Sequence, residues 1–181
     1  MRRALTATLL CAALLAGCAQ LPREEPAAGG FELSGRVAVR YGQESATGRV
    51  QWRHDVANDD LLITTPLGQG VARIVRAADG VRLETSEGRT YRAPDAESLT
   101  QQVLGWRLPL EGLPDWIRAR QRPGSPADIQ PGEGGRPYTL RQDGWQVEYE
   151  EYAGSRPARM RLTHPNVEIR LVVESMTAEP P

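Results

Sequence analysis

The sequence predicts a mainly β protein, built as one strongly curved antiparallel sheet with two short helices across its open side. Three observations predict this fold class. Apolar and polar residues alternate along about ten segments between residues 31 and 176. Short turns, most of them with glycine, separate many of these segments. Only two helical patterns interrupt them, between the sixth and the seventh segment.

The first part of the domain is predicted to be a meander of six strands. In the first strand Phe31, Leu33 and Val37 alternate with polar residues, which is typical of a strand with one buried face. Residues 42–44 break this pattern before a second alternating segment, which indicates a hairpin. The six predicted strands are residues 31–41, 46–54, 61–65, 70–76, 81–85 and 89–93.

Two short helices are predicted next. Asp95 can cap a helix over residues 96–104, and Gly105 can end it. The second helix follows Leu113, with Pro114 at its first position, where the missing N–H has no intrahelical role.

The last part of the chain is predicted to return to strands. Residues 123–135 contain three prolines and four glycines, which favours a loop. Asp143-Gly144 then supplies a strong hairpin signal. The four further predicted strands are residues 137–142, 145–153, 158–164 and 167–176.

A sheet curved in this way either fills its concave face with side chains or leaves a cavity there. Candidate lining residues are the apolar ones expected on that face: Leu33, Val37, Val50, Trp52, Leu99, Trp116, Trp145, Tyr149, Met160 and Leu162. Periodicity alone favours a solid core made of the same residues. Both alternatives stay open from the residue pattern.

The N-terminus has the features of a secretory signal. Arg2 and Arg3 precede an apolar run that is too short to span a membrane and stay there. Leu15-Ala16-Gly17-Cys18 resembles the bacterial lipobox. This resemblance implies that Cys18 is acylated and that the peptide bond before it is cut. The alternative is an ordinary signal peptide with a chance cysteine.

Four segments are therefore expected. They are a signal peptide (1–17), a lipidated flexible tether (18–30), a single half-barrel domain (31–176) and a tail (177–181). Ala19 and Gln20 follow the cysteine, whereas an aspartate directly after it retains enteric lipoproteins in the inner membrane. We therefore expect a lipid anchor in the outer membrane, with the domain on its periplasmic face.

Composition and motifs argue against several other classes of function. The net charge is −1, and the 22 basic residues, all arginine, are interspersed with acidic ones, which argues against nucleic-acid binding. His54 and His164 each lack a second ligand at zinc spacing. Glu148 and Glu150 fall on one face of a predicted strand, and a solvated face is favoured over a catalytic carboxylate pair. We expect no catalysis, no metal, no cofactor and a monomer.

One turn is a candidate functional site. Pro66 suits the second position of a type I turn and Gly68 suits the fourth, which places Leu67 at the tip. From the residues alone, the favoured interpretation is that Leu67 folds back onto the sheet, because single exposed apolar residues are common.

Several segments, taken in order, resemble the LolB family, the outer-membrane lipoprotein receptors of Gram-negative bacteria. The resemblance spans residues 31–174, and the sequence departs from it at Ala119, where glycine is expected, and at 174–176, where a tryptophan is expected. The segments are Gly35-Arg36-Val37-Ala38-Val39, Trp52, Pro66-Leu67-Gly68-Gln69, Leu108-Pro109-Leu110, 113–118, Asp143-Gly144-Trp145 with Tyr149 and Tyr152, and 157–162.

The resemblance implies a half-open antiparallel β-barrel with a helical lid over an apolar cavity. It also implies that the protein accepts triacylated lipoproteins from a LolA-like periplasmic carrier and inserts them into the outer membrane, driven by affinity alone. Leu67 would then enter the membrane lipid. Two alternatives remain from other classes: a structural envelope lipoprotein without lipid cargo, and a lipid-modifying enzyme.

Overall fold

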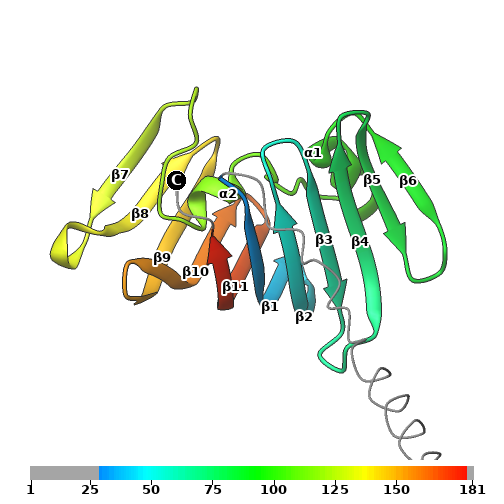
Figure 1. Cartoon of the computed structure of the whole chain (residues 1–181), viewed down its shortest axis with the longest axis horizontal. Helices are drawn as coiled ribbons and strands as arrows, with labels where there is room; N and C mark the ends of the chain where they lie inside the picture. The colour runs from blue at the N-terminus through cyan, green and yellow to red at the C-terminus, as the bar shows by residue number, and fades with distance from the viewer. Residues whose placement is uncertain (1–28, 179–181) are drawn as a thin grey trace, which may run out of the picture.

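Eleven antiparallel strands form one sheet in the computed structural model, which describes residues 29–178 (Figure 1). The strands are β1 (Phe31–Tyr41), β2 (Glu44–His54), β3 (Asp59–Thr64), β4 (Gly70–Ala77), β5 (Gly80–Thr85), β6 (Thr90–Ala93), β7 (Ala127–Pro131), β8 (Pro137–Gln142), β9 (Trp145–Ala153), β10 (Arg156–His164) and β11 (Val167–Ala178). The predicted mainly β fold with few helices is confirmed.

The first and last strands are neighbours at the centre of the sheet. The order is β6-β5-β4-β3-β2-β1-β11-β10-β9-β8-β7. Strand β1 pairs with β11 along its whole length, from Phe31 opposite Ala178 to Tyr41 opposite Val167. Two meanders, one from each part of the chain, are therefore joined by this central pair.

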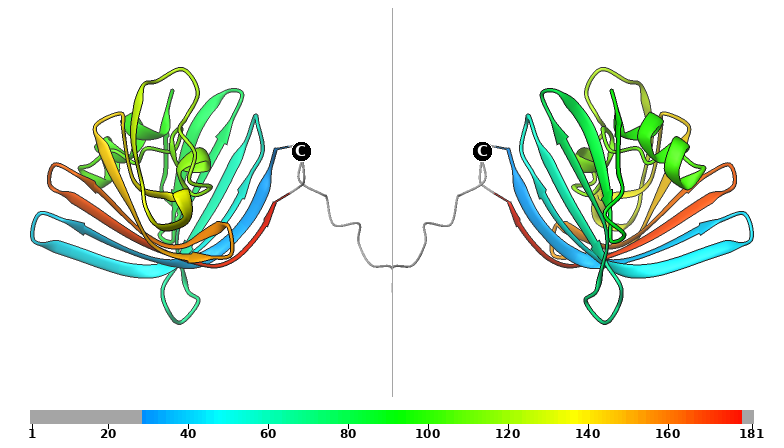
Figure 2. Two further views of the ribbon diagram at one scale, coloured as in Figure 1. Left: turned by 90° about the vertical axis from the view of Figure 1, so that its left-hand side faces the viewer. Right: turned by 90° about the vertical axis from the view of Figure 1, so that its right-hand side faces the viewer.

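The sheet curls into an open cup, with the helices inside its concave side (Figure 2). A bulge between Ser34 and Gly35 shifts the register of β1 against β11, and bulges bend strands. A Cβ added at Gly35 would lie 2.3 Å from the carbonyl oxygen of Val172. Gly48 on β2 is similar, because an added Cβ would lie 2.5 Å from the carbonyl oxygen of Thr64. The close approach of the neighbouring strand therefore requires glycine at both positions.

Helix α1 (Ala96–Leu104) has the predicted bounds and caps. The carboxylate of Asp95 accepts hydrogen bonds from the backbone N–H and the hydroxyl of Ser98, at 2.7 and 2.9 Å. These bonds stabilise the charged form and lower the pKa of Asp95. Gly105 ends the helix in the left-handed conformation, with φ of 80°.

Helix α2 (Leu113–Trp116) is one short turn, with Pro114 at its beginning. Its Trp116 is fully buried, and the indole lies against Gly112, where an added Cβ would come within 2.5 Å of the ring. Ala119 follows with φ of 56°, a conformation that favours glycine. None of the helices in residues 29–178 has the length and apolar character needed to cross a bilayer.

Two predictions about the chain are wrong. The predicted loop at 123–135 contains the edge strand β7 and a 3-10 turn at Glu133–Gly135. Strand β7 is mostly exposed and has little apolar periodicity, so the pattern does not reveal it. Thr177 and Ala178, predicted to belong to the tail, extend β11 and pair with Glu32 and Phe31.

Replacing Gly35 with alanine should lower the free energy of unfolding by about 2 kcal/mol or more, because backbone blocks the added methyl group. Urea unfolding of the purified variant measures this. Gly70→Ala is the matched control, since a Cβ there meets no atom within 4 Å. Equal stability of the two variants would show that the approach to Val172 does not matter.

Candidate functional site: an apolar cavity and a protruding turn

A cavity of about 550 Å³ lies between the concave face of β1–β5, β10 and β11 and the segment that begins at α1, which we call the lid segment. Its walls are mainly apolar. The sheet contributes Trp52, Leu61, Ile74 and Leu83, and the lid segment contributes Val103, Leu104, Trp106 and Leu108. Polar residues such as Glu44, Ser45 and Thr47 belong to the first part of β2, where these side chains are exposed. The interior therefore suits an apolar ligand.

The predicted lining residues divide into two groups. Five of them line the cavity: Leu33, Val37, Val50, Trp52 and Leu162. The other five are buried in the core outside the cavity wall: Leu99, Trp116, Trp145, Tyr149 and Met160. Both alternatives left open by the sequence therefore occur, since one part of the concave face is hollow and the other is packed.

The packed part is solid because α2 covers it. The hydroxyl of Tyr149 donates a hydrogen bond of 2.9 Å to the carbonyl of Trp116, which ties β9 to the end of α2. Burial raises the pKa of Tyr149, so the hydroxyl keeps its proton and remains a donor. Trp116 thus occupies concave space that would otherwise extend the cavity.

Gln142 on β8 fastens the segment that follows α2. Its amide oxygen accepts hydrogen bonds from the indole N–H of Trp116 (2.8 Å) and the backbone N–H of Arg122 (2.9 Å). Its amide nitrogen donates to the carbonyls of Arg122 (2.9 Å) and Ser125 (2.8 Å). Gln142 is buried, and both acceptor lone pairs and both N–H donors of its amide are used.

Residues missed by the sequence analysis complete the lining, among them Val39, Ile63, Val71, Trp106 and Leu108. Val39 continues the alternation of Leu33 and Val37, so the period-2 pattern could have found it. Trp106 and Leu108 lie in an irregular segment, and no periodicity indicates which way such residues point.

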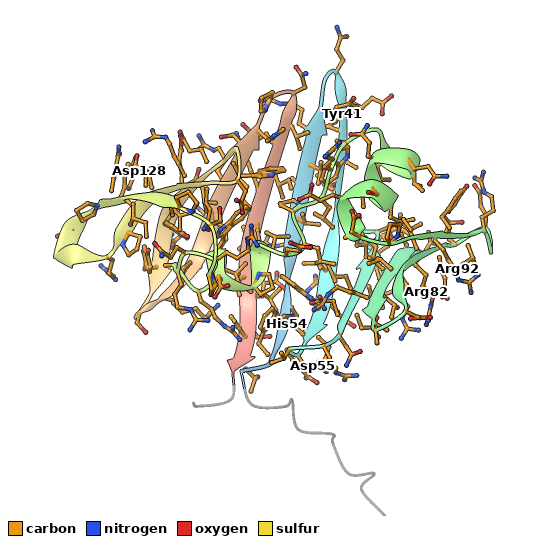
Figure 3. All side chains as sticks on the ribbon, turned by 90° about the horizontal axis from the view of Figure 1, so that it is seen from above. Tyr41, His54, Asp55, Arg82, Arg92 and Asp128 are labelled. Atoms are coloured by element: carbon orange, nitrogen blue, oxygen red, sulfur yellow. The ribbon has the colours of Figure 1, made fainter. Side chains whose placement is uncertain are left out.

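A buried carboxylate, Asp59, holds the indole of the lining residue Trp52 in place. Asp59, at the start of β3, accepts a hydrogen bond of 2.8 Å from the indole N–H of Trp52. His54 Nδ1 lies 2.8 Å from the same oxygen, and Arg76 binds the other oxygen. Asp59 is therefore fully paired, and His54 has a structural partner. Tyr41 and His54 lie at opposite ends of the β1–β2 pair (Figure 3).

His164 has an aromatic neighbour, and Glu148 and Glu150 share a basic partner. His164 lies against Trp145, with the ring centroids 5.0 Å apart. Within residues 29–178 no group of three histidine, cysteine, aspartate or glutamate side chains is placed to hold a metal ion. Glu148 and Glu150 both pair with Arg161, which agrees with a strand face of paired charges.

The turn between β3 and β4 has the predicted geometry. The N–H of Gly68 donates to the carbonyl of Thr65 (2.9 Å), which places Pro66 and Leu67 at the two central positions. The N–H of Thr65 donates to the carbonyl of Gln69 (2.8 Å). Leu67 is 91% exposed, so the interpretation that it folds back onto the sheet is wrong. The turn projects on the side opposite the helices (Figures 1 and 2).

The β5–β6 hairpin contains a turn with the same hydrogen bonds. Between β5 and β6, the N–H of Gly88 donates to the carbonyl of Thr85 and the N–H of Thr85 donates to Arg89, both at 2.9 Å. Glu87 takes the position that Leu67 has in the first turn. This backbone geometry therefore does not require leucine.

The first described residues, Gly29 and Gly30, are held next to the end of α2. Arg118 donates hydrogen bonds to the carbonyls of Gly29 (2.8 Å) and Gly30 (3.3 Å). Its guanidinium also lies over the ring of Phe31, 4.9 Å from the centroid. Removal from water lowers the pKa of Arg118. The point where residues 1–28 join the domain is therefore defined.

The fold and the cavity define a class of protein: an open antiparallel half-barrel whose helical lid covers an apolar cavity. A family model described as "Outer membrane lipoprotein LolB" matches residues 29–175. The chain belongs to the LolB family.

Two relatives illustrate the similarity. An outer-membrane lipoprotein LolB of Thiobacillus denitrificans is 42% identical over 173 residues, covering 92% of this chain and 93% of the relative. One of Azoarcus sp. is 36% identical and covers 95% of both chains. Among solved structures, a LolA superfamily protein from Nitrosomonas europaea is 13% identical, covers 83% of this chain and 87% of its own, and has a TM-score of 0.46.

These relatives confirm the predicted family and the predicted outer-membrane lipoprotein location. The signal peptide at 1–17, the acylation of Cys18 and most of the tether lie outside the described residues, and they stay predictions.

Replacing Gln142 with glutamate should destabilise the domain by about 3 kcal/mol, because an acceptor would then face the carbonyls of Arg122 and Ser125. Limited trypsin digestion should cleave faster after Arg120, which directly precedes the segment that Gln142 holds. Gln130→Glu on the exposed strand β7 is the control. Unchanged cleavage in Gln142→Glu would mean that the amide does not hold this segment.

Proposed function

We propose that this protein takes up the acyl chains of lipoproteins in its cavity and delivers the lipoproteins to the outer membrane. The observation that carries the proposal is the open apolar cavity of about 550 Å³ in a chain of the LolB family. A LolA-like periplasmic carrier is the proposed donor and a triacylated lipoprotein the proposed cargo. The receiving partner is outer-membrane lipid, and the protein acts as a monomer.

The energetics of acyl chains support a shielding cavity. Three chains of ordinary length carry on the order of 40 methylenes, and burying each one is worth about 0.8 kcal/mol. Such a cargo cannot cross water with its chains exposed. The sequence contains no phosphate-binding loop, so transfer is proposed to run downhill in affinity from carrier to cavity to bilayer.

The lining favours transport over the two alternative functions. A structural lipoprotein with a solid core gains nothing from a cavity, since voids forfeit packing contacts. A lipid-modifying enzyme needs a reactive polar group that faces the ligand. Asp59, the buried carboxylate beside the wall, is already paired with Trp52, His54 and Arg76.

Leu67 is the proposed membrane contact, together with the Pro66 and Gly68 that shape its turn. A leucine that is 91% exposed leaves apolar surface in water, and burying such a side chain is worth about 1.5–3 kcal/mol. The Thr85–Arg89 turn has the same backbone with Glu87 at the tip. Leucine is thus unnecessary for the turn, which supports a role outside the domain.

Replacing Leu67 with glutamate should leave cargo uptake intact and stall insertion into liposomes, because a charged tip cannot enter the bilayer. Uptake is measured by transfer of a labelled lipoprotein from its carrier, and insertion by flotation with the vesicles. Val56→Glu is the matched control, since Val56 is 78% exposed in a turn that does not line the cavity. Equal loss of both steps would make Leu67 structural.

Filling the cavity should weaken ligand binding. Ala72→Trp places an indole among the lining residues and should raise the dissociation constant of a fluorescent fatty acid at least tenfold. The measurement uses mature Cys18→Ala protein, with displacement by a lipopeptide. Ala38 alternates with the lining residues Val37 and Val39 and so points to the other face, which makes Ala38→Trp the control. Unaltered affinity in Ala72→Trp would place the ligand elsewhere.

A further inference from the structure

The hairpin that carries Leu67 contains an irregularity beside the cavity. Strands β3 and β4 pair in regular register from Asp59 to Ile63, which lies opposite Ala72. The next pair is Thr64 with Gly70, so Val71 has no partner across the ladder. Val71 is therefore the extra residue of a β-bulge.

At this bulge both Val71 and its neighbour Ala72 lie at the cavity. In a regular strand, neighbouring side chains point to opposite faces. Ala72 lines the cavity, so regular geometry would put Val71 on the outer face, yet Val71 lines the cavity as well. Bulges commonly redirect a side chain in this way. The backbone N–H of Ser86 donates to the carbonyl of Val71 at 3.0 Å and fixes the arrangement.

Val71 lies between the cavity and the protruding turn. It is 43% exposed and belongs to the mouth, whereas Ile63 on the paired strand lies further in and is only partly exposed. Leu67 is four residues away along the same hairpin, a distance that the chain spans in at most about 14 Å. The cavity wall, Val71 and Leu67 thus follow in that order along one hairpin, with residues 68–70 between the last two.

We propose that Val71 is a step on an apolar exit track, along which an acyl chain leaves the cavity toward the bilayer at Leu67. The occupant of the track is an acyl chain of the cargo, and the inference rests on the proposed function. An acyl chain on this track leaves the cavity wall, contacts Val71 and then enters the membrane. Less of its apolar surface is exposed to water during the transfer. The acyl chain would therefore leave the cavity mouth on the side of the β3–β4 hairpin.

The opposite side of the mouth supplies the comparison. Leu104, at the end of α1, also lines the cavity and is also 43% exposed. Because it belongs to the lid and not to the hairpin with Leu67, a charge there blocks no path to the turn. Val71→Glu and Leu104→Glu therefore place the same charge at the same exposure on two sides of one opening.

The experiment loads the mature Cys18→Ala chain with a fluorescent triacylated lipopeptide and mixes it with vesicles of phosphatidylethanolamine and phosphatidylglycerol. Val71→Glu should slow transfer of bound lipopeptide about tenfold, equivalent to about 1.4 kcal/mol in the barrier, and weaken its binding much less. For Leu104→Glu, the fold-change in the transfer rate should be no larger than the fold-change in the dissociation constant. Val71→Leu should restore transfer, and Val56→Glu should behave as the unsubstituted chain.

Three outcomes would overturn the exit track. They are equal slowing by Val71→Glu and Leu104→Glu, loss of binding in Val71→Glu as large as its loss of transfer, and normal transfer in Val71→Glu. The proposed function fails in a distinguishable way, since the unsubstituted chain would then neither bind the lipopeptide nor deliver it.

Discussion

The close passage of two backbones at the centre of the sheet is the constraint on which the cup depends. Gly35 lies against the carbonyl of Val172, at the bulge where β1 shifts its register against β11. Because this pair joins the two meanders, a bend here sets the angle between both parts of the concave face. The part of the concave face at β9 is covered by α2, and the part at β1–β5 remains open as the cavity.

These two parts have opposite energetic roles. A hollow forfeits contacts that a filled core would make, so an empty cavity weakens the fold. The packed part compensates with Trp116, which is fully buried and hydrogen-bonded to Gln142, and with Tyr149, which binds the carbonyl of the same tryptophan. A domain that keeps open space for a ligand is therefore stabilised by the part that binds none.

Sequence reasoning reached the strands, the caps of α1 and the geometry of the Leu67 turn, because alternation and turn chemistry are local signals. It missed β7, whose exposed edge has little apolar pattern. It predicted Trp116 in the cavity wall, whereas Trp116 is buried in the packed part. Periodicity indicates which face of an element a residue occupies, but not which residues it packs against. Ala119 shows the reverse case: the family departure coincides with φ of 56°, where glycine is free of strain.

The two matching turns separate folding from ligand delivery. Thr65–Gln69 and Thr85–Arg89 form the same backbone bonds, yet one tip is leucine and the other glutamate. The tip side chain therefore carries no structural duty, and natural selection can change it without disturbing the hairpin. In evolutionary terms, a substitution at this tip changes what the turn can contact and leaves the backbone hydrogen bonds of the hairpin in place.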